Sequence, residues 1–371
     1  MIREWDAMLN GASSVPEERW HAARDLAEAK GFKFIEANEL LQGPVEDIVT
    51  RVEAVGAGSR KARLQAASAL LGTTPPPKIT VTRALDLYWE LTETDQRGKS
   101  DDQIRRMRNP VIKAFKNFVD VVGDKAVSGI SRDDMLDFRA WWADRINESS
   151  CKASTANKDL THFSKVLKRV NDLKRLGYDL PVSGLSFKEG RKEPRCPFST
   201  NWIRDRLLEP DALKGLNTQA RCILLGMINT GYRPIEGAAL LPQRIKLEGA
   251  VPMIEIRPDE REVKTDRAIR DIPLAGVSLE AFREYRDGFP RYRDKPGLSA
   301  TINKFLRGNG LMETPKHSMY GLRHAFEDRL LEAGVDERIR RDFMGHQLSR
   351  EQYGNGASPR RALECISLIA L

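Results

Sequence analysis

The sequence predicts a mainly α-helical protein with a small antiparallel β-sheet in its C-terminal domain. Apolar residues recur at helical spacing along most of the chain, which favours helices. Alternating apolar residues on either side of a turn occur within residues 251–274, which favours a small sheet there. The chain has 371 residues, enough for two or three domains, and two segments rich in proline, glycine or charge divide it.

These divisions predict four segments. Residues 1–77 are expected to be a helical N-terminal segment that ends in a proline-rich linker. Residues 78–183 are expected to form a helical domain. Residues 184–197 mix glycine, proline and charge, and we interpret them as a second linker. Residues 198–371 are expected to form the C-terminal domain, which carries the sheet and ends in an amphipathic helix.

The helical domain at 78–183 is predicted to contain four helices. Pro110 is expected at or near the start of the second helix, because proline is tolerated in a first turn. Ser131 is expected to cap the third, with Met135, Phe138 and Trp142 pointing inward. These assignments give the domain a core formed by the inward faces of its helices.

The fourth helix, from Ala153 onward, has two contrasting faces. Its apolar residues follow one helical stripe: Leu160, Phe163, Leu167 and Val170. Its basic candidates fall on the opposite side at 100° per residue: Lys158, His162, Lys165 and Arg169. No acid stands among these four, so the face fits the phosphate backbone of a nucleic acid duplex. An ordinary solvated helix face explains the same pattern equally well.

The C-terminal domain is predicted to alternate helices with one hairpin. A buried helix at 219–229 is expected to end at Gly231 in a left-handed turn, and Pro234 is expected to open the next helix. A strand at 251–256 and a hairpin within 262–274 complete the sheet. Further helices are expected at 278–287, 299–307, 319–332, 336–344 and 359–370.

Composition limits the classes of partner. Lys and Arg exceed Asp and Glu by 61 to 53, giving a formal charge of +8 and a pI near 9.3. This excess favours a polyanionic partner, although many proteins without one share it. Four cysteines without paired spacing indicate a reduced, cytoplasmic compartment. No apolar run reaches the roughly 18 residues of a membrane span, so we expect no membrane partner.

One C-terminal stretch gathers residues suited to phosphate chemistry. Arg323, His346 and Tyr353 lie near predicted helix ends, and Tyr320 precedes the arginine by three positions. An arginine grips phosphate oxygens through two parallel donors. A tyrosine oxygen attacks phosphorus and holds it covalently, and a histidine donates to an oxygen or moves a proton near neutral pH. The set suits the binding and attack of a phosphodiester.

At this point the sequence resembles the tyrosine recombinase family of the phage integrase type. The matching pieces stand in the family's order, and residues 78–183 resemble its helical core-binding domain, which binds DNA. The pieces are Thr230–Leu240, Val263–Thr265 with Arg270–Leu274, Tyr320–Phe326, Met344–His346, and Tyr353–Gly354.

The resemblance implies a role for each matching position. Arg233 and Arg323 are similar to the two arginines that clamp the scissile phosphate. Lys264 resembles the hairpin lysine that protonates the leaving 5′ oxygen, and His346 resembles the histidine that bonds a non-bridging oxygen. Tyr353 resembles the nucleophile that forms a 3′-phosphotyrosyl bond.

Two features depart from the family pattern. Tyr320 stands where the family usually has histidine, and a phenol is a poor base at neutral pH. We therefore interpret Tyr320 as a positioning group, with a nucleophilic role for it as the rival. The spacing of seven from His346 to Tyr353 is shorter than usual, which puts the local turn in question more than the role.

The resemblance implies a site-specific DNA recombinase, most naturally the integrase of a mobile element. A type IB topoisomerase and a DNA-binding protein without catalysis are the alternatives. The expected partners are double-stranded DNA and further copies of the chain, as a tetramer on DNA. The absence of a P-loop and of an acidic cluster predicts that no cofactor and no metal is needed. The final helix either docks on a neighbouring copy or packs on its own domain.

Overall fold

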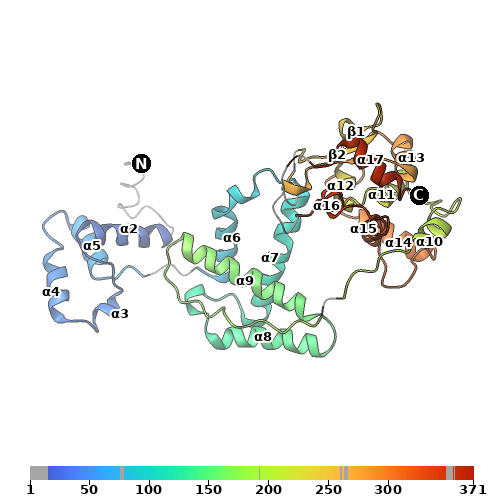
Figure 1. Cartoon of the computed structure of the whole chain (residues 1–371). Coiled ribbons are helices and arrows are strands. Elements are labelled where there is room, and N and C mark those ends of the chain that lie inside the picture. Colours follow the sequence, from blue (N-terminus) through green and yellow to red (C-terminus); the bar gives the residue numbers. More distant parts are fainter. Residues whose placement is uncertain are drawn as a thin grey trace. The chain divides into compact units, whose positions relative to one another are not determined.

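The computed structural model describes residues 16–75, 79–191, 193–259, 261–262, 266–347, 354 and 356–371 (Figure 1). These residues form two compact units. The first contains the described residues up to Thr92 together with Val111–Lys188, and the second contains Glu93–Pro110 and Glu189–Leu371. The boundaries of the four expected segments remain predictions. No helix within the described residues is long and apolar enough to cross a bilayer.

The first unit is entirely helical apart from its connecting segments. Its elements are α2 (Pro16–Ala29), α3 (Ala37–Leu40), α4 (Val45–Glu53), α5 (Arg60–Leu70), α6 (Val81–Leu91), the second half of α7 (Asp101–Val122), the 3₁₀ turn η2 (Val127–Gly129), α8 (Arg132–Asn147) and α9 (Ala153–Leu173). Trp20 of α2 is 5% exposed and belongs to the same buried cluster as the side chains of α6–α9. Ala23 and Ala27 of α2 instead form a separate small cluster with Ala69 and Leu70 of α5, so Trp20 is the buried residue that joins these N-terminal helices to the main core.

Aromatic rings form the centre of this core. Phe163 of α9 stacks on Phe118 of α7 with ring centroids 4.2 Å apart, and Phe138 of α8 meets Phe118 edge-on at 5.3 Å. The Ser131 hydroxyl accepts a hydrogen bond from the Asp134 amide in a reciprocal capping box, which confirms the expected start of α8. The predicted apolar stripe of α9 is confirmed, since all four of its residues are buried.

The prediction that Pro110 lies at or near a helix start is wrong. Helix α7 begins at Asp101, and Pro110 lies inside it. The buried carboxylate of Asp102 pairs with Arg105 and with Arg106, whose Nε lies 2.6 Å from Oδ2. This acidic first turn fixes the start upstream, because a carboxylate there is favoured by the helix dipole. The helix then continues through the proline despite the lost amide donor.

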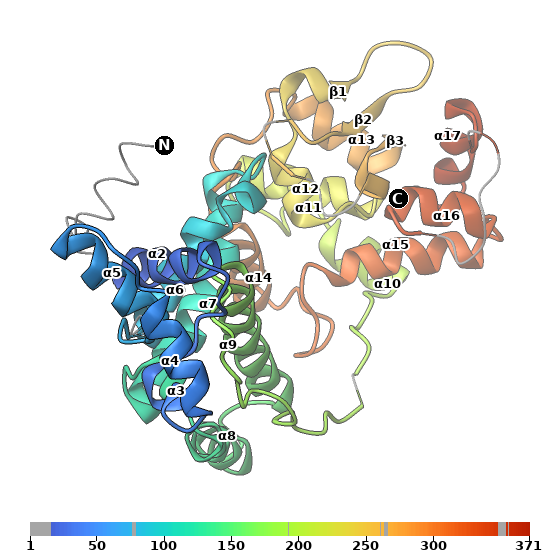
Figure 2. The same ribbon diagram turned by 90° about the vertical axis from the view of Figure 1, so that its left-hand side faces the viewer.

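The second unit combines helices with a three-stranded sheet. Its elements are η1 (Glu93–Gln96), the first half of α7, α10 (Thr200–Trp202) continued by the π turn η3 (Ile203–Leu207), α11 (Thr218–Ile228), α12 (Pro234–Ala239), η4 (Pro242–Arg244), β1 (Ile245–Lys246), β2 (Met253–Ile256), η5 (Asp266–Ala268), β3 (Arg270–Pro273), α13 (Gly276–Glu284), α14 (Leu298–Gly308), α15 (Gly321–Glu332), α16 (Glu337–Met344) and α17 (Pro359–Ser367). Figure 2 shows the sheet beside α11, α12 and α13.

The sheet confirms the predicted strands at 251–256 and 269–274, which pair antiparallel, and adds a third strand, β1. The first arm of the hairpin predicted within 262–274 includes residues 263–265, which lie outside the described residues, so the hairpin itself stays a prediction. The strand order is β1-β2-β3, and Ile254 of β2 pairs with Ile245 on one side and with Ile272 on the other. Strand β1 has two residues, too few for an alternating pattern to reveal it. Buried isoleucines on all three strands join the sheet to the helical core.

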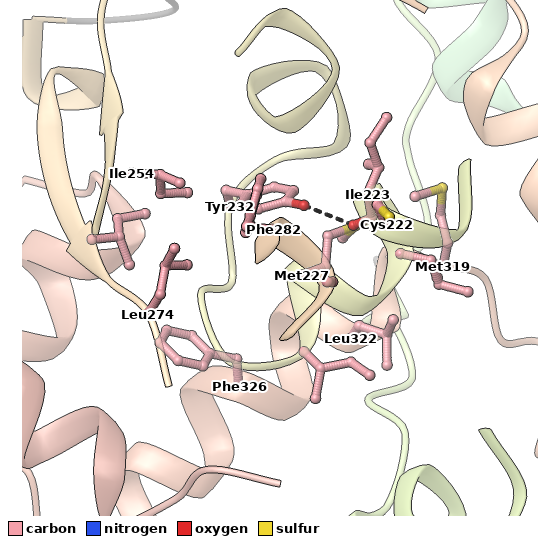
Figure 3. Close-up of a cluster of buried hydrophobic side chains, with 14 of the residues drawn as sticks. Cys222, Ile223, Met227, Tyr232, Ile254, Leu274, Phe282, Met319, Leu322 and Phe326 are labelled. Atoms are coloured by element: carbon pink, nitrogen blue, oxygen red, sulfur yellow. Dashed lines mark hydrogen bonds between the residues drawn. The ribbon is translucent and has the colours of Figure 1, made fainter. Parts of the chain in front are cut away.

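Tyr232 anchors the turn between α11 and α12. Its ring is fully buried, and its hydroxyl donates to the Ile223 carbonyl oxygen at 2.7 Å, the dashed bond in Figure 3. Gly231 has a φ of 60°, which confirms the predicted left-handed turn after α11. The two residues before Arg233 are thus fixed, Gly231 in a left-handed turn and Tyr232 in the core, and they hold Arg233 in a defined position.

The final helix packs on its own unit, which is one of the two alternatives the sequence left open. Ile366 of α17 is fully buried and Ala362 is 8% exposed, and both belong to the second unit's core. Arg329 of α15, itself 5% exposed, donates from Nη1 to the Ile369 carbonyl oxygen at 2.6 Å. A buried cation bonded to backbone carbonyls thus ties the C-terminal segment to α15.

Candidate active site

Among the described residues of the second unit, Arg323 is the most deeply buried cation. It lies on the first turn of α15 and is 1% exposed. Its Nη1 donates to the Gly231 carbonyl oxygen at 2.6 Å, and its Nη2 donates to the Met344 carbonyl oxygen. Burial, followed by the charge of Arg233, lowers its pKa to about 10, so it remains a cation at neutral pH. Both acceptors are neutral carbonyl oxygens, so these hydrogen bonds do not neutralise the positive charge of Arg323. The buried charge therefore favours the binding of an anion.

Arg233 lies where α11 and α12 meet. It is the N-cap residue of α12, because Pro234 occupies the first helical position. Its Nη1 donates to Glu236 Oε1 at 2.6 Å, and its backbone amide donates to Oε2 at 2.8 Å. The Arg233 side chain is 12% exposed. Its charge acts on both Arg323 and His346, so the turn brings it into the same site as Arg323.

Glu236 joins Arg233 to a third arginine that sequence reasoning did not assign. Arg270 of β3 donates from Nη2 to Glu236 Oε2 at 2.8 Å, and both side chains are less than a tenth exposed. Burial alone would raise the pKa of Glu236. The charge and hydrogen bond of Arg270, together with Arg233, instead lower it to about 2. Glu236 is therefore ionised throughout the physiological range.

Arg270 connects three separate segments of the site. Besides Glu236, it donates from Nε to the Phe343 carbonyl oxygen at 2.7 Å and from Nη1 to the Ala268 carbonyl oxygen at 2.7 Å. The guanidinium thereby links α12, the segment before β3 and the end of α16. The sequence did contain the motif Arg270–Leu274, which resembles the family, but the resemblance assigned no role to Arg270.

His346 follows the end of α16, where Gly345 turns the chain with a φ of 58°. Its Nε2 lies 3.2 Å from Arg323 Nη2. Since a guanidinium only donates, Nε2 accepts this bond, and in a neutral ring the proton is then on Nδ1. Burial, and then the charges of Arg323 and Arg233, lower the pKa of His346 to about 4. The ring is therefore neutral at physiological pH.

The described part of this cluster carries a net positive charge. It contains the guanidiniums of Arg233, Arg270 and Arg323, while Glu236 is the described carboxylate hydrogen-bonded to the first two. With His346 neutral, three positive charges and one negative charge leave a net charge of two. A buried site of this charge favours an anion with several oxygens, which each guanidinium grips through two donors.

Known proteins share this fold. No family model matches the sequence, and no curated protein matches it. The Tn1549 transposon integrase, solved with transposon right end DNA, matches with 15% identity and a TM-score of 0.51, over 71% of this chain and 91% of that one. A lambda integrase dimer on a COC′ core site matches with 13% identity and a TM-score of 0.52, over 73% and 93%. A lambda integrase tetramer on a Holliday junction matches with 12% identity and a TM-score of 0.51, over 85% and 89%. This chain has the tyrosine-recombinase fold.

Two residues that the family pattern assigns to catalysis, Lys264 and Tyr353, lie outside the described residues. Gly354, directly after the tyrosine, is described, and its carbonyl oxygen accepts from Arg338 Nη2 at 2.7 Å. Gly354, the residue after Tyr353, lines the same cavity as His346, with a volume of about 410 Å³.

Tyr320 lies at the N-terminal end of α15, three residues before Arg323. Its ring centroid is 4.3 Å from the guanidinium carbon of Arg195 and 5.6 Å from the ring of His324. It also interacts electrostatically with Arg323. Burial, and then Arg195, lower the pKa of His324, whose Nε2 is buried and has no hydrogen-bond partner within the described residues.

The four basic candidates of α9 lie in the first unit, away from the buried stripe. Lys158, Lys165 and Arg169 are exposed, and His162 is half-buried. Burial lowers the pKa of His162, against the opposing effect of Asp159, so it contributes little charge at neutral pH. The structure thus provides an exposed face with three permanent cations rather than four.

Proposed function

We propose that this protein is a site-specific DNA recombinase of the integrase type, which cleaves and rejoins DNA through a 3′-phosphotyrosyl intermediate. The observation that carries the proposal is Arg323, a buried cation held by backbone carbonyls, with His346 bonded to it and Arg233 next to it. A scissile phosphate between the two guanidiniums would offset part of the cluster's net positive charge. The shared fold and the family-ordered motifs support this assignment.

The arginine pair suits the transition state better than the ground state. A phosphodiester carries one negative charge, and a phosphorane-like transition state gathers more on its equatorial oxygens. The cluster already has a net charge of two before DNA binds, and its donors are fixed by backbone and carboxylate partners. Preorganised donors of this kind stabilise developing charge without reorganisation.

The remaining steps use Tyr353 and Lys264. The Tyr353 oxygen attacks phosphorus and gives its proton to solvent, while the bond from phosphorus to the 5′ oxygen breaks. Lys264 gives a proton to that oxygen, which leaves as an alcohol. Rejoining reverses these steps with a 5′ hydroxyl as the attacking group. One phosphodiester is exchanged for another, so no nucleotide is consumed.

His346 accepts from Arg323 in the free protein, so its Nε2 is not a donor there. A phosphate oxygen that engages Arg323 Nη2 would release Nε2 from this bond. The phosphate's negative charge also favours a protonated ring, which then donates to a non-bridging oxygen. His346 is therefore expected to change its protonation or tautomer when DNA binds.

The proposed partners are double-stranded DNA and further copies of this chain. The exposed cations of α9 would contact the phosphate backbone. Strand exchange needs more than one active site, and lambda integrase is a tetramer on a Holliday junction. We propose the same assembly here, with the C-terminal helix remaining on its own protomer.

A nicked duplex tests the proposal. The substrate spans the DNA that flanks the gene, where an integrase gene often has its own attachment site. A nick close to the scissile phosphate lets the short 5′-hydroxyl fragment leave, which traps the covalent complex. The wild-type protein should give a denaturation-resistant protein–DNA band, and Tyr353→Phe should not.

The variant Tyr320→Phe serves as the matched control, because it removes the rival nucleophile and keeps the ring. It should still form the covalent band. Tight binding of the flanking DNA without an adduct by the wild-type protein would contradict the recombinase proposal and favour a DNA-binding protein without catalysis.

A further inference from the structure

The end of the expected linker crosses the N-terminal end of α15. A Cβ atom on Gly321 would lie 2.6 Å from the Cys196 carbonyl oxygen and 3.1 Å from the Phe198 ring. No real Cβ tolerates the first of these distances, so glycine at 321 is what lets the linker lie this close. Residues 195–198, which are distant from α15 in sequence, therefore pack against the end of the helix that carries Tyr320 and Arg323.

His317 holds this linker segment in place. Its Nδ1 accepts from the Thr314 amide at 3.1 Å, so the proton of a neutral ring is on Nε2. Nε2 lies 2.9 Å from the Pro197 carbonyl oxygen and therefore donates to it. The ring also packs against Phe198 at 4.6 Å between centroids. These contacts anchor the linker from both its backbone and its side chains.

Arg195, at the start of this anchored segment, reaches the active-site helix. Its guanidinium carbon lies 4.3 Å from the Tyr320 ring centroid, the geometry of a cation–π contact. Its charge lowers the pKa of His324, after the larger effect of burial. Within the described residues no carboxylate hydrogen-bonds to Arg195, so Tyr320 is its described contact.

We propose that Arg195 is a positioning residue that fixes the Tyr320 ring at the N-terminal end of α15, near Arg323. Docking of the linker on α15 and assembly of the phosphate site would then be one event. This inference rests on the proposed function. It assigns to a linker arginine and a tyrosine together the place where the family usually has a histidine.

The test separates positioning from charge and from folding. Single-turnover formation of the covalent complex is measured on the nicked duplex at saturating protein, and DNA affinity is measured separately. Arg195→Ala should slow the covalent step about tenfold, with affinity changed less than about twofold. Arg195→Lys should restore part of the rate, since an ammonium also binds an aromatic face. Arg191→Ala, which removes another exposed linker arginine, should behave like the wild-type protein.

A double-mutant cycle identifies the partner. In a Tyr320→Ala background, Arg195→Ala should slow the covalent step by less than about twofold, because the ring it positions is gone. An undiminished loss in that background, or a loss of affinity as large as the loss of rate, would overturn the proposal in favour of simple DNA attraction. A lowered thermal midpoint with equal losses of rate and affinity would also overturn it.

The positioning role of Arg195 can be tested even if the recombinase proposal fails. If the wild-type protein forms no adduct, amide hydrogen exchange of the free protein still reports on positioning. Arg195→Ala should speed exchange at the amides of residues 321–323, and Arg191→Ala should not. Equal exchange in the two variants would overturn the positioning role.

Discussion

The basic face of α9 and the arginine cluster of the second unit both collect positive charge, but they hold it differently. Lys158, Lys165 and Arg169 stand exposed on one helix. Arg323 is 1% exposed, and its donors are fixed by carbonyl oxygens from two distant segments. The α9 face spreads its charge over a surface, where the loss of one cation leaves the others in place. The arginine cluster concentrates its charge at one point, where hydrogen bonds hold each donor. Substitutions should therefore have graded effects in the first and severe effects in the second.

The largest effect is expected for Arg323→Lys, which tests whether fixed donors matter more than charge. An ammonium keeps the charge but cannot engage Gly231, Met344 and a phosphate with a planar fork. We expect covalent complex formation to fall about 10²–10³-fold. Single-turnover kinetics measure this, and DNA affinity should change little. A loss below about fivefold would show that the cluster behaves like the exposed face.

The second prediction concerns Arg270→Met, which removes the cluster's cation that is paired with Glu236 and bonded to the Phe343 carbonyl oxygen. Glu236 would keep Arg233 but lose its second buried partner. Because breaking a buried pair leaves an uncompensated charge, the free energy of unfolding should fall by about 3 kcal/mol. Urea denaturation measures this. The control is Arg257→Met, which removes a more exposed pair with Asp271 and should cost less than about 1 kcal/mol.

The third prediction is a pH dependence that the exposed cations cannot show. The pKa of His346 is about 4 in the folded protein and 6.5 by reference, so the unfolded chain binds the extra proton between these values. The stability that this group contributes is therefore complete above about pH 6.5 and declines as the pH falls toward 4.

Thermal midpoints at about pH 7 and pH 5 measure this effect. The midpoint of the wild-type protein should fall further across this interval than that of His346→Gln, which has no titrating ring. Equal declines would mean that His346 does not lie among the arginines.

The smallest effect is expected for Lys165→Ala on the α9 face. The loss of one phosphate contact should weaken DNA binding and reduce the slope of log affinity against log salt by about 0.9. Binding titrations at several salt concentrations measure this slope. Lys33→Ala, which removes an exposed lysine of the same unit outside α9, should leave the slope unchanged. An unchanged slope in Lys165→Ala would remove α9 from the proposed DNA interface.

The difference between local and long-range contacts explains which features the sequence predicted. The buried and exposed faces of α9, the Ser131 cap and the turn at Gly231 depend on residues a few positions apart, so local spacing predicted them. Pro110 was misjudged because the acidic first turn upstream outweighs the preference of proline for a helix start.

It was harder to predict from the sequence which side chains of the second unit meet at the candidate active site. Arg323 was singled out by its residue type and its place near a helix end, whereas Arg233 was assigned through a family resemblance, and the structure brings both together with His346. Arg270 had no assigned role, because its acceptors are residues 236, 268 and 343 and no local pattern joins them. Arg195 was missed for the same reason, since its contact with Tyr320 crosses 125 positions.

The most direct test of the central claim is to identify the residue that carries the DNA. The covalent complex formed by the wild-type protein on the nicked duplex is digested with protease and nuclease, and the nucleotide-bearing peptide is sequenced by mass spectrometry. The account predicts a phosphodiester remnant on Tyr353. A remnant on Tyr320, or on any other residue, would contradict the proposed geometry of attack.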